Sequence, residues 1–211
     1  MSDGDNARQT RMRKQVAKLT SNILNPYLVS LFVIILLSLE STSSLSDAIK
    51  WSLILIVVTI MPVFFVIVYL AHKEKVEGIF IVARRQRNKF YILACICAVA
   101  GCLTLLLGDA PLVLMATFVA ALSAIIVFMS INLLWKISLH TAFAAGSVTV
   151  LTIIYGAVGA LSVMLVPPIA WARIELKQHS LAQAIAGALL ATLIVVVVFH
   201  LFGLLGATTP L

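Results

Sequence analysis

Long runs of apolar residues are the feature that most constrains how this chain folds. Of its 211 residues, 62% are hydrophobic and 11% are charged, whereas soluble domains average about 25% charged residues. Most runs approach the roughly 20 residues that a helix needs to cross a bilayer, and a spanning helix satisfies its own backbone hydrogen bonds. The sequence therefore predicts an all-α, polytopic membrane helix bundle. The expected spans are 24–40, 51–71, 90–108, 111–133, 139–156, 159–173 and 180–204.

The number of crossings depends on the fifth and sixth runs. Gly156 and Gly159 separate these runs, and Pro167 and Pro168 interrupt the sixth, because proline lacks the backbone donor of a helix interior. We expect seven spans, or six if these two runs do not both cross the membrane.

The basic residues favour the seven-span topology. With seven spans, all but Lys50 of the 15 Lys and Arg residues lie on one face, and such an excess marks the cytoplasmic side. We therefore expect a multi-pass protein of the cell membrane with a cytoplasmic N-terminus and an external C-terminus. A basic N-terminal segment, 1–22, precedes a single transmembrane domain, 23–211. This segment spaces its Lys and Arg residues as a surface helix on anionic lipid would.

Acidic residues and cysteines argue against several functions. None of the eight Asp and Glu residues falls in the middle of an expected span. This disfavours a proton-coupled transporter and a prenyltransferase that holds Mg²⁺ with aspartate-rich motifs. Cys95, Cys97 and Cys102 lie in the third span without nearby His or acidic residues, which is typical of packing residues. We expect no metal site and no cofactor. We also expect no nucleic-acid partner, because topology accounts for nearly all of the +7 charge.

Polar residues at the ends of the spans form a candidate site. Ser138 and His140 stand at the start of the fifth span, and Arg173 and His179 flank the turn before the last span. In the seven-span topology they share the cytoplasmic face. Imidazoles supply a nucleophile and a proton donor, while arginine and a helix N-terminus bind anions. The set therefore predicts chemistry on a phosphate. Lys75, Arg84 and Arg87 follow the second span and are further phosphate-binding candidates.

Two segments carry a family resemblance. The segments 136–142 (KISLHTA) and 172–183 (ARIELKQHSLAQ) resemble two motifs of the type-2 phosphatidic acid phosphatase superfamily, written P-S-G-H and S-R-x5-H-x3-D. The spacing of Arg173 and His179 matches the second of these motifs. Members of this superfamily are membrane-bound, metal-independent lipid phosphatases. The resemblance covers about 132–204 and implies a phosphatase-like core in the C-terminal half of the chain.

The resemblance also implies a role for each site residue. His179 would be the nucleophile that forms a phosphohistidine intermediate, and His140 would protonate the leaving oxygen. Ser138 and Arg173 would hold the phosphoryl group, and Gln183 takes the place of the aspartate that orients the nucleophile. The implied function is an integral-membrane hydrolase that removes phosphate from a lipid phosphate or prenyl diphosphate and contacts membrane lipids.

Departures from the family pattern leave a second hypothesis open. Leu139 replaces a glycine and Gln183 replaces the aspartate. A glutamine can orient an imidazole but cannot stabilise its positive charge, and neutralising the orienting Asp of a serine protease costs about 10⁴-fold in rate. The alternative is a catalytically silent relative that binds a phospholipid headgroup or supports a partner complex, with both histidines as ordinary helix-boundary residues. A small lipid or solute transporter also fits the hydropathy. The oligomeric state and the substrate identity stay open.

Overall fold

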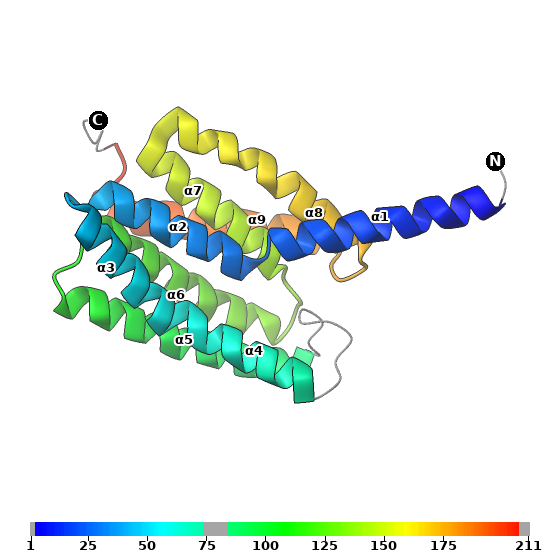
Figure 1. Ribbon diagram of the computed structural model, residues 1–211, viewed down its shortest axis with the longest axis horizontal. Coiled ribbons are helices and arrows are strands. Elements are labelled where there is room, and N and C mark those ends of the chain that lie inside the picture. Colours follow the sequence, from blue (N-terminus) through cyan, green and yellow to red (C-terminus); the bar gives the residue numbers. More distant parts are fainter. Residues whose placement is uncertain (1–2, 74–83, 207–211) are drawn as a thin grey trace. The chain divides into compact units, whose positions relative to one another are not determined.

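The computed structural model describes residues 3–73 and 84–206, and every regular element in these ranges is a helix (Figure 1). This confirms the all-α prediction. Within the described residues, six helical stretches are long and apolar enough to cross a membrane, as expected of a multi-pass membrane protein. These stretches are Arg8–Ser41, Leu45–Val66, Asn88–Leu107, Leu112–Asn132, Leu139–Glu175 and Leu181–Leu201.

The individual helices follow the expected spans, but the second begins at Leu45 rather than at 51 and the third at Arg84 rather than at 90. Ser44 caps the second, because the Ser44 Oγ accepts a hydrogen bond of 3.0 Å from the Asp47 backbone N–H. The elements are α1 (Asp3–Ile23), α2 (Pro26–Ser41), α3 (Leu45–Leu55), the π-helical turn η1 (Ile56–Ile60), α4 (Met61–Lys73), α5 (Arg84–Leu107), α6 (Leu112–Asn132), α7 (Leu139–Ala160), the 3-10 turn η2 (Leu161–Leu165), α8 (Val166–Glu175) and α9 (Leu181–Leu201).

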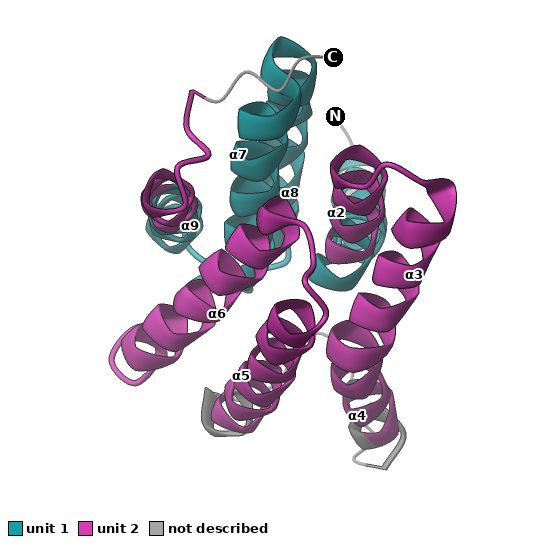
Figure 2. Cartoon of the chain, turned by 90° about the vertical axis from the view of Figure 1, so that its left-hand side faces the viewer, with its two compact units in different colours: residues 1–29, 137–192 teal, residues 30–136, 193–211 magenta. Residues whose placement is uncertain are grey.

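The chain divides into two compact units, coloured separately in Figure 2. Unit 1 contains Met1–Val29 and Ile137–Thr192, and unit 2 contains Ser30–Lys136 and Leu193–Leu211. Unit 1 therefore holds α1, α7, α8 and the first half of α9. Every candidate site residue of the C-terminal half of the chain lies in this unit.

A helical hairpin forms the centre of unit 1. The backbone of α7 breaks at Gly156, which has φ 58° and ψ −132°, a conformation that residues with a Cβ rarely adopt. After η2, α8 returns and packs against α7 (Figure 1). Pro167 and Pro168 stand in the first turn of α8, where a helix needs no backbone donor. The predicted break between the fifth and sixth runs is thus confirmed at Gly156, and the apolar stretch Leu139–Glu175 folds back on itself.

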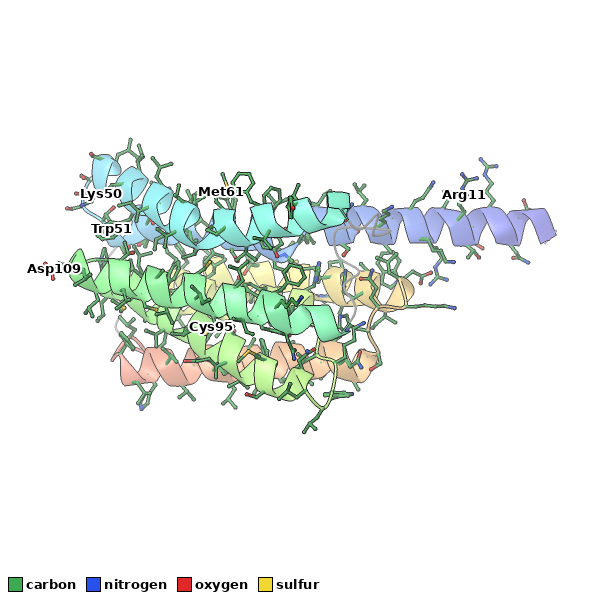
Figure 3. The ribbon with its side chains drawn as sticks, turned by 90° about the horizontal axis from the view of Figure 1, so that it is seen from below. Arg11, Lys50, Trp51, Met61, Cys95 and Asp109 are labelled. Atoms are coloured by element: carbon green, nitrogen blue, oxygen red, sulfur yellow. The ribbon has the colours of Figure 1, made fainter. Side chains whose placement is uncertain are left out.

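Helix α1 packs against α8 in the same unit. Ala17 and Ser21 are buried on one side of α1, while Met12, Val16 and Leu19 are more than half exposed on another. Figure 3 shows the Arg11 side chain projecting away from this helix. The predicted basic N-terminal helix is therefore present, and one of its sides is already used for packing within the protein.

Unit 2 contains most of α2, the helices α3 and α4 joined through η1, the helices α5 and α6, and the end of α9. Helix α5 packs against α6, η1 and α4. Gly101 allows the close approach, because a Cβ there would meet Thr59 at 2.8 Å and Phe118 at 3.0 Å. The Asn132 side chain donates a hydrogen bond of 2.9 Å to Asn88, which joins the polar ends of α5 and α6. In Figure 3, Cys95 lies along α5.

Candidate functional site

The turn that follows α8 places Arg173 and His179 close together. The Lys177 N–H donates to the Ile174 carbonyl at 2.8 Å, and the Gln178 N–H donates to the Arg173 carbonyl at 3.1 Å. This pair of bonds, with Lys177 at φ 54°, is the Schellman ending of a helix. The His179 N–H also donates to the Arg173 carbonyl, at 3.3 Å. The six-residue spacing of Arg173 and His179 in the sequence therefore corresponds to a tight, hydrogen-bonded turn.

Helix α9 begins with a reciprocal pair of hydrogen bonds. The Ser180 Oγ accepts from the Gln183 N–H at 3.3 Å, and the Gln183 Oε1 accepts from the Ser180 N–H at 3.1 Å. This is a capping box, in which Ser and Gln stand three residues apart at the start of a helix. The sequence interpretation missed this role of Gln183, although the spacing S-x-x-Q before an apolar run was visible.

The same amide oxygen also orients His179. The His179 Nδ1 lies 3.2 Å from the Gln183 Oε1. An amide oxygen can only accept, so the contact requires a hydrogen on Nδ1, and the neutral imidazole then carries its lone pair on Nε2. Gln183 thus selects the tautomer in which the His179 Nε2 can act as a nucleophile.

The N-terminus of α7 lies against α9 at this position. The Ser138 N–H donates to the Gln183 carbonyl at 3.3 Å. Gly187 permits the approach, since a Cβ there would lie 2.6 Å from the Ser138 carbonyl oxygen. The Ser138 side chain is fully buried, and its Oγ has no hydrogen-bond partner within the described part of the chain. The start of α7 therefore offers a hydroxyl and the backbone donors of a helix end to an anion.

His140 and Arg173 complete the cluster. Both side chains are buried, with exposed fractions of 7% and 4%. His140 stands in the first turn of α7, two residues after Ser138, whose backbone N–H bonds to α9. The Arg173 Nη1 donates a hydrogen bond of 2.9 Å to the Ser21 Oγ of α1. No sequence motif predicted this contact between Arg173 and Ser21.

The structure thus brings together five of the eight predicted site residues, all in unit 1: Ser138, His140, Arg173, His179 and Gln183. Lys75 lies outside the described residues. Arg84 and Arg87 begin α5 in unit 2, but their side chains are outside the described part, so their role stays a prediction.

The arrangement can bind an anion and transfer a group to nitrogen. It offers a buried guanidinium, an unpartnered hydroxyl, helix N–H groups, one imidazole with a defined tautomer and a second imidazole nearby. Among residues 3–73 and 84–206, no three His, Cys, Asp or Glu side chains gather as metal ligands would.

Comparison with known proteins identifies no family for this chain. No protein-family model matches it, and no curated protein or solved structure shows significant similarity to it. A functional assignment therefore depends on the residues and geometry of the site described above.

Proposed function

We propose that this protein is an integral-membrane, metal-independent hydrolase that removes phosphate from a lipid phosphate or a prenyl diphosphate. One observation carries the proposal: Gln183 holds the Nδ1 of His179 at 3.2 Å, in a turn that also hydrogen-bonds to Arg173. This geometry supports an oriented nucleophile beside a phosphate-binding cation.

The proposed reaction has two steps. In the first, the His179 Nε2 attacks phosphorus, the bond from phosphorus to the leaving oxygen breaks, and His140 donates a proton to that oxygen. In the second, water attacks the phosphohistidine, His140 accepts a proton from the water, and inorganic phosphate departs. Each imidazole returns to its starting state, so the cycle balances without a metal or a redox partner.

Arg173 and Ser138 are the proposed binding groups for the phosphoryl oxygens. The guanidinium supplies several donors and a permanent positive charge. The Ser138 hydroxyl is buried without a hydrogen-bond partner in the described chain, and a buried hydroxyl is costly unless something satisfies it. A phosphate oxygen at the N-terminus of α7 would satisfy it. Lys75, Arg84 and Arg87 are proposed to add positive charge as the substrate headgroup enters.

The proposed membrane arrangement has seven passes, with α7 and the η2–α8 segment crossing separately. It follows from the reversal of the chain at Gly156 and from the distribution of Lys and Arg. It puts the N-terminus and the site at the cytoplasmic face and the C-terminus outside. A lipid substrate would then keep its apolar tail in the bilayer while its headgroup reaches Arg173.

Phosphate release in the presence of EDTA tests this function. The purified protein is assayed in detergent against prenyl diphosphates, phosphatidic acid and phosphatidylglycerol phosphate. We expect release that survives EDTA and is lost in His179→Ala. His200→Ala is the matched control, because this exposed histidine lies in the last turn of α9, at the other end of the helix from His179. No release from any substrate by folded protein would contradict a hydrolytic function.

The capping box favours a second candidate function. Gln183 already serves α9 by accepting from Ser180, and its neutral amide cannot stabilise an imidazolium as a carboxylate does. The same site would then bind a phospholipid headgroup without turnover. Headgroup binding that depends on Arg173, with no phosphate release, would favour this alternative.

A further inference from the structure

The N-terminal helix contributes a side chain to the candidate site. The Ser21 Oγ accepts a hydrogen bond from the Arg173 Nη1 at 2.9 Å, across 152 residues of sequence. Ser21 is only 2% exposed, so water does not easily replace it as a partner. α1 is therefore in contact with the residue proposed to bind phosphate.

A second contact fixes how α1 lies along α8. Arg13 and Glu175 form an ion pair at 2.9 Å. Arg173 contacts Ser21, whereas Glu175, which follows it in α8, contacts Arg13, which precedes Ser21 in α1. The two helices are therefore antiparallel. An exposed ion pair contributes little stability by itself. Together with the buried Ala17, however, it sets the register that brings Ser21 to Arg173.

We infer that Ser21 is a positioning residue of the phosphate site, acting through the Arg173 guanidinium. The inference rests on the proposed function. Arginine has a long, flexible side chain that loses considerable entropy when it is ordered, and its donors lie in a fixed plane. A hydrogen bond at one Nη atom fixes that plane before the ligand arrives. Because the hydroxyl is neutral, it orients the guanidinium without cancelling the charge that attracts phosphate.

A merely structural role for Ser21 makes a different prediction. If Ser21 only satisfies a buried donor, its removal lowers the stability of the protein and leaves phosphate affinity unchanged. If Ser21 positions Arg173, its removal weakens phosphate binding by about tenfold, the usual effect of one charge-assisted hydrogen bond. The Michaelis constant for the lipid substrate should rise in parallel, with a smaller change in kcat.

The test uses full-length protein with inorganic phosphate as the probe. Its dissociation constant is obtained from the rise of the melting temperature with phosphate concentration. The variants are Ser21→Ala and Ser21→Cys. The thiol keeps nearly the same volume but is a weak acceptor, so it provides a second variant if the alanine protein does not fold. Ser38→Ala is the matched control, because Ser38 is also fully buried in a helix and its Oγ has no partner in the described chain.

We expect both Ser21 variants to bind phosphate about tenfold more weakly, with Ser38→Ala binding as the wild type does. Unchanged phosphate affinity in a folded Ser21 variant would overturn the inference and leave the proposed function standing. A wild-type protein that neither binds phosphate nor releases it from any substrate would overturn the proposed function, and the inference with it.

Discussion

Gln183 serves two purposes at once, and this distinguishes the site at the scale of single residues. Its side-chain oxygen accepts from Ser180 to cap α9 and also contacts the His179 Nδ1. A carboxylate of the same length would keep both interactions and add a negative charge beside the imidazole. The glutamine is therefore compatible with an oriented nucleophile whose charged form lacks electrostatic support.

The first prediction concerns Gln183→Glu. The variant keeps the capping box, because Glu is equally good at this position, and its carboxylate stabilises the positive charge that the His179 ring gains when Nε2 bonds to phosphorus. We expect kcat to rise about tenfold or more, short of the about 10⁴-fold effect of an aspartate in a serine-protease triad. The measurement is steady-state phosphate release, and Gln178→Glu serves as a nearby control. An unchanged or lower rate in a stable variant would contradict the proposed role of Gln183.

A second prediction concerns Gln183→Ala. Loss of the cap should cost about 1 kcal/mol of stability, and loss of the contact to His179 should reduce turnover. Ser180→Ala removes the cap from the other side but leaves the His179 contact, so it should lower stability by a similar amount with a much smaller loss of turnover. Thermal unfolding and phosphate release, measured on both variants, separate the two effects. Equal losses of turnover in both would show that Gln183 acts only as a cap.

At the level of helices, two close approaches shape unit 1, and one of them lies at the site. Gly187 lets α9 touch the start of α7, and Gly159 lets the chain pass close to the Leu151 carbonyl after the break at Gly156. A side chain at position 187 would collide with the backbone of Ser138. The backbone cannot move aside as easily as the end of a flexible side chain can.

We predict that Gly187→Ala displaces Ser138 and disturbs the site. Its Cβ would lie 2.6 Å from the Ser138 carbonyl oxygen, and overpacking of this kind typically costs about 1–3 kcal/mol. Phosphate release should fall more than the loss of stability alone explains, because the anion-binding end of α7 moves. Leu189→Ala, on the exposed side of the same helix, is the control. Wild-type activity in Gly187→Ala would argue against Ser138 as a phosphate ligand.

Gly159→Ala tests the hairpin independently of the chemistry. A Cβ at this position would collide with the Leu151 carbonyl, so α7 and α8 could not keep their packing. We expect a clearly lower melting temperature, whereas Ala157→Ser, at an exposed position in the same turn, should melt close to the wild type. A Gly159→Ala protein as stable as the wild type would contradict the hairpin geometry.

The sequence predicted the helices far better than it predicted the contacts between them. Apolar runs specify membrane helices because lipid allows few other backbone structures, and Gly156 was identifiable as a break. The spacing of Arg173 and His179 also corresponds to one hydrogen-bonded turn of the structure. The hydrogen bond from Arg173 to Ser21 was not predictable, because 152 residues separate them and only packing of α1 on α8 brings them together. The left-handed Lys177 carries no sequence signal either, since glycine is the usual residue there.

For the molecule as a whole, the proposed topology determines which loops face the cytoplasm. In the proposed topology Lys177 lies on the cytoplasmic face and Lys50 on the external face. Both side chains are exposed, so cysteines placed there can react with a probe. In a background with Cys95, Cys97 and Cys102 replaced by alanine, Lys50→Cys should be labelled by a membrane-impermeant thiol reagent in intact cells. Lys177→Cys should be labelled only after permeabilisation. The reverse pattern would invert the topology and place the site outside.

If His179 carries the phosphoryl group during turnover, as we propose, the phosphohistidine can be trapped. The protein is mixed with a lipid substrate labelled with ³²P in the transferred phosphate, quenched in alkali and digested. We predict a label on the peptide that contains His179, stable in alkali and lost in acid as a phosphohistidine is, and absent from His179→Ala. Steady phosphate release by the wild type with no label on the protein at any quench time, or a label that persists in His179→Ala, would contradict the mechanism.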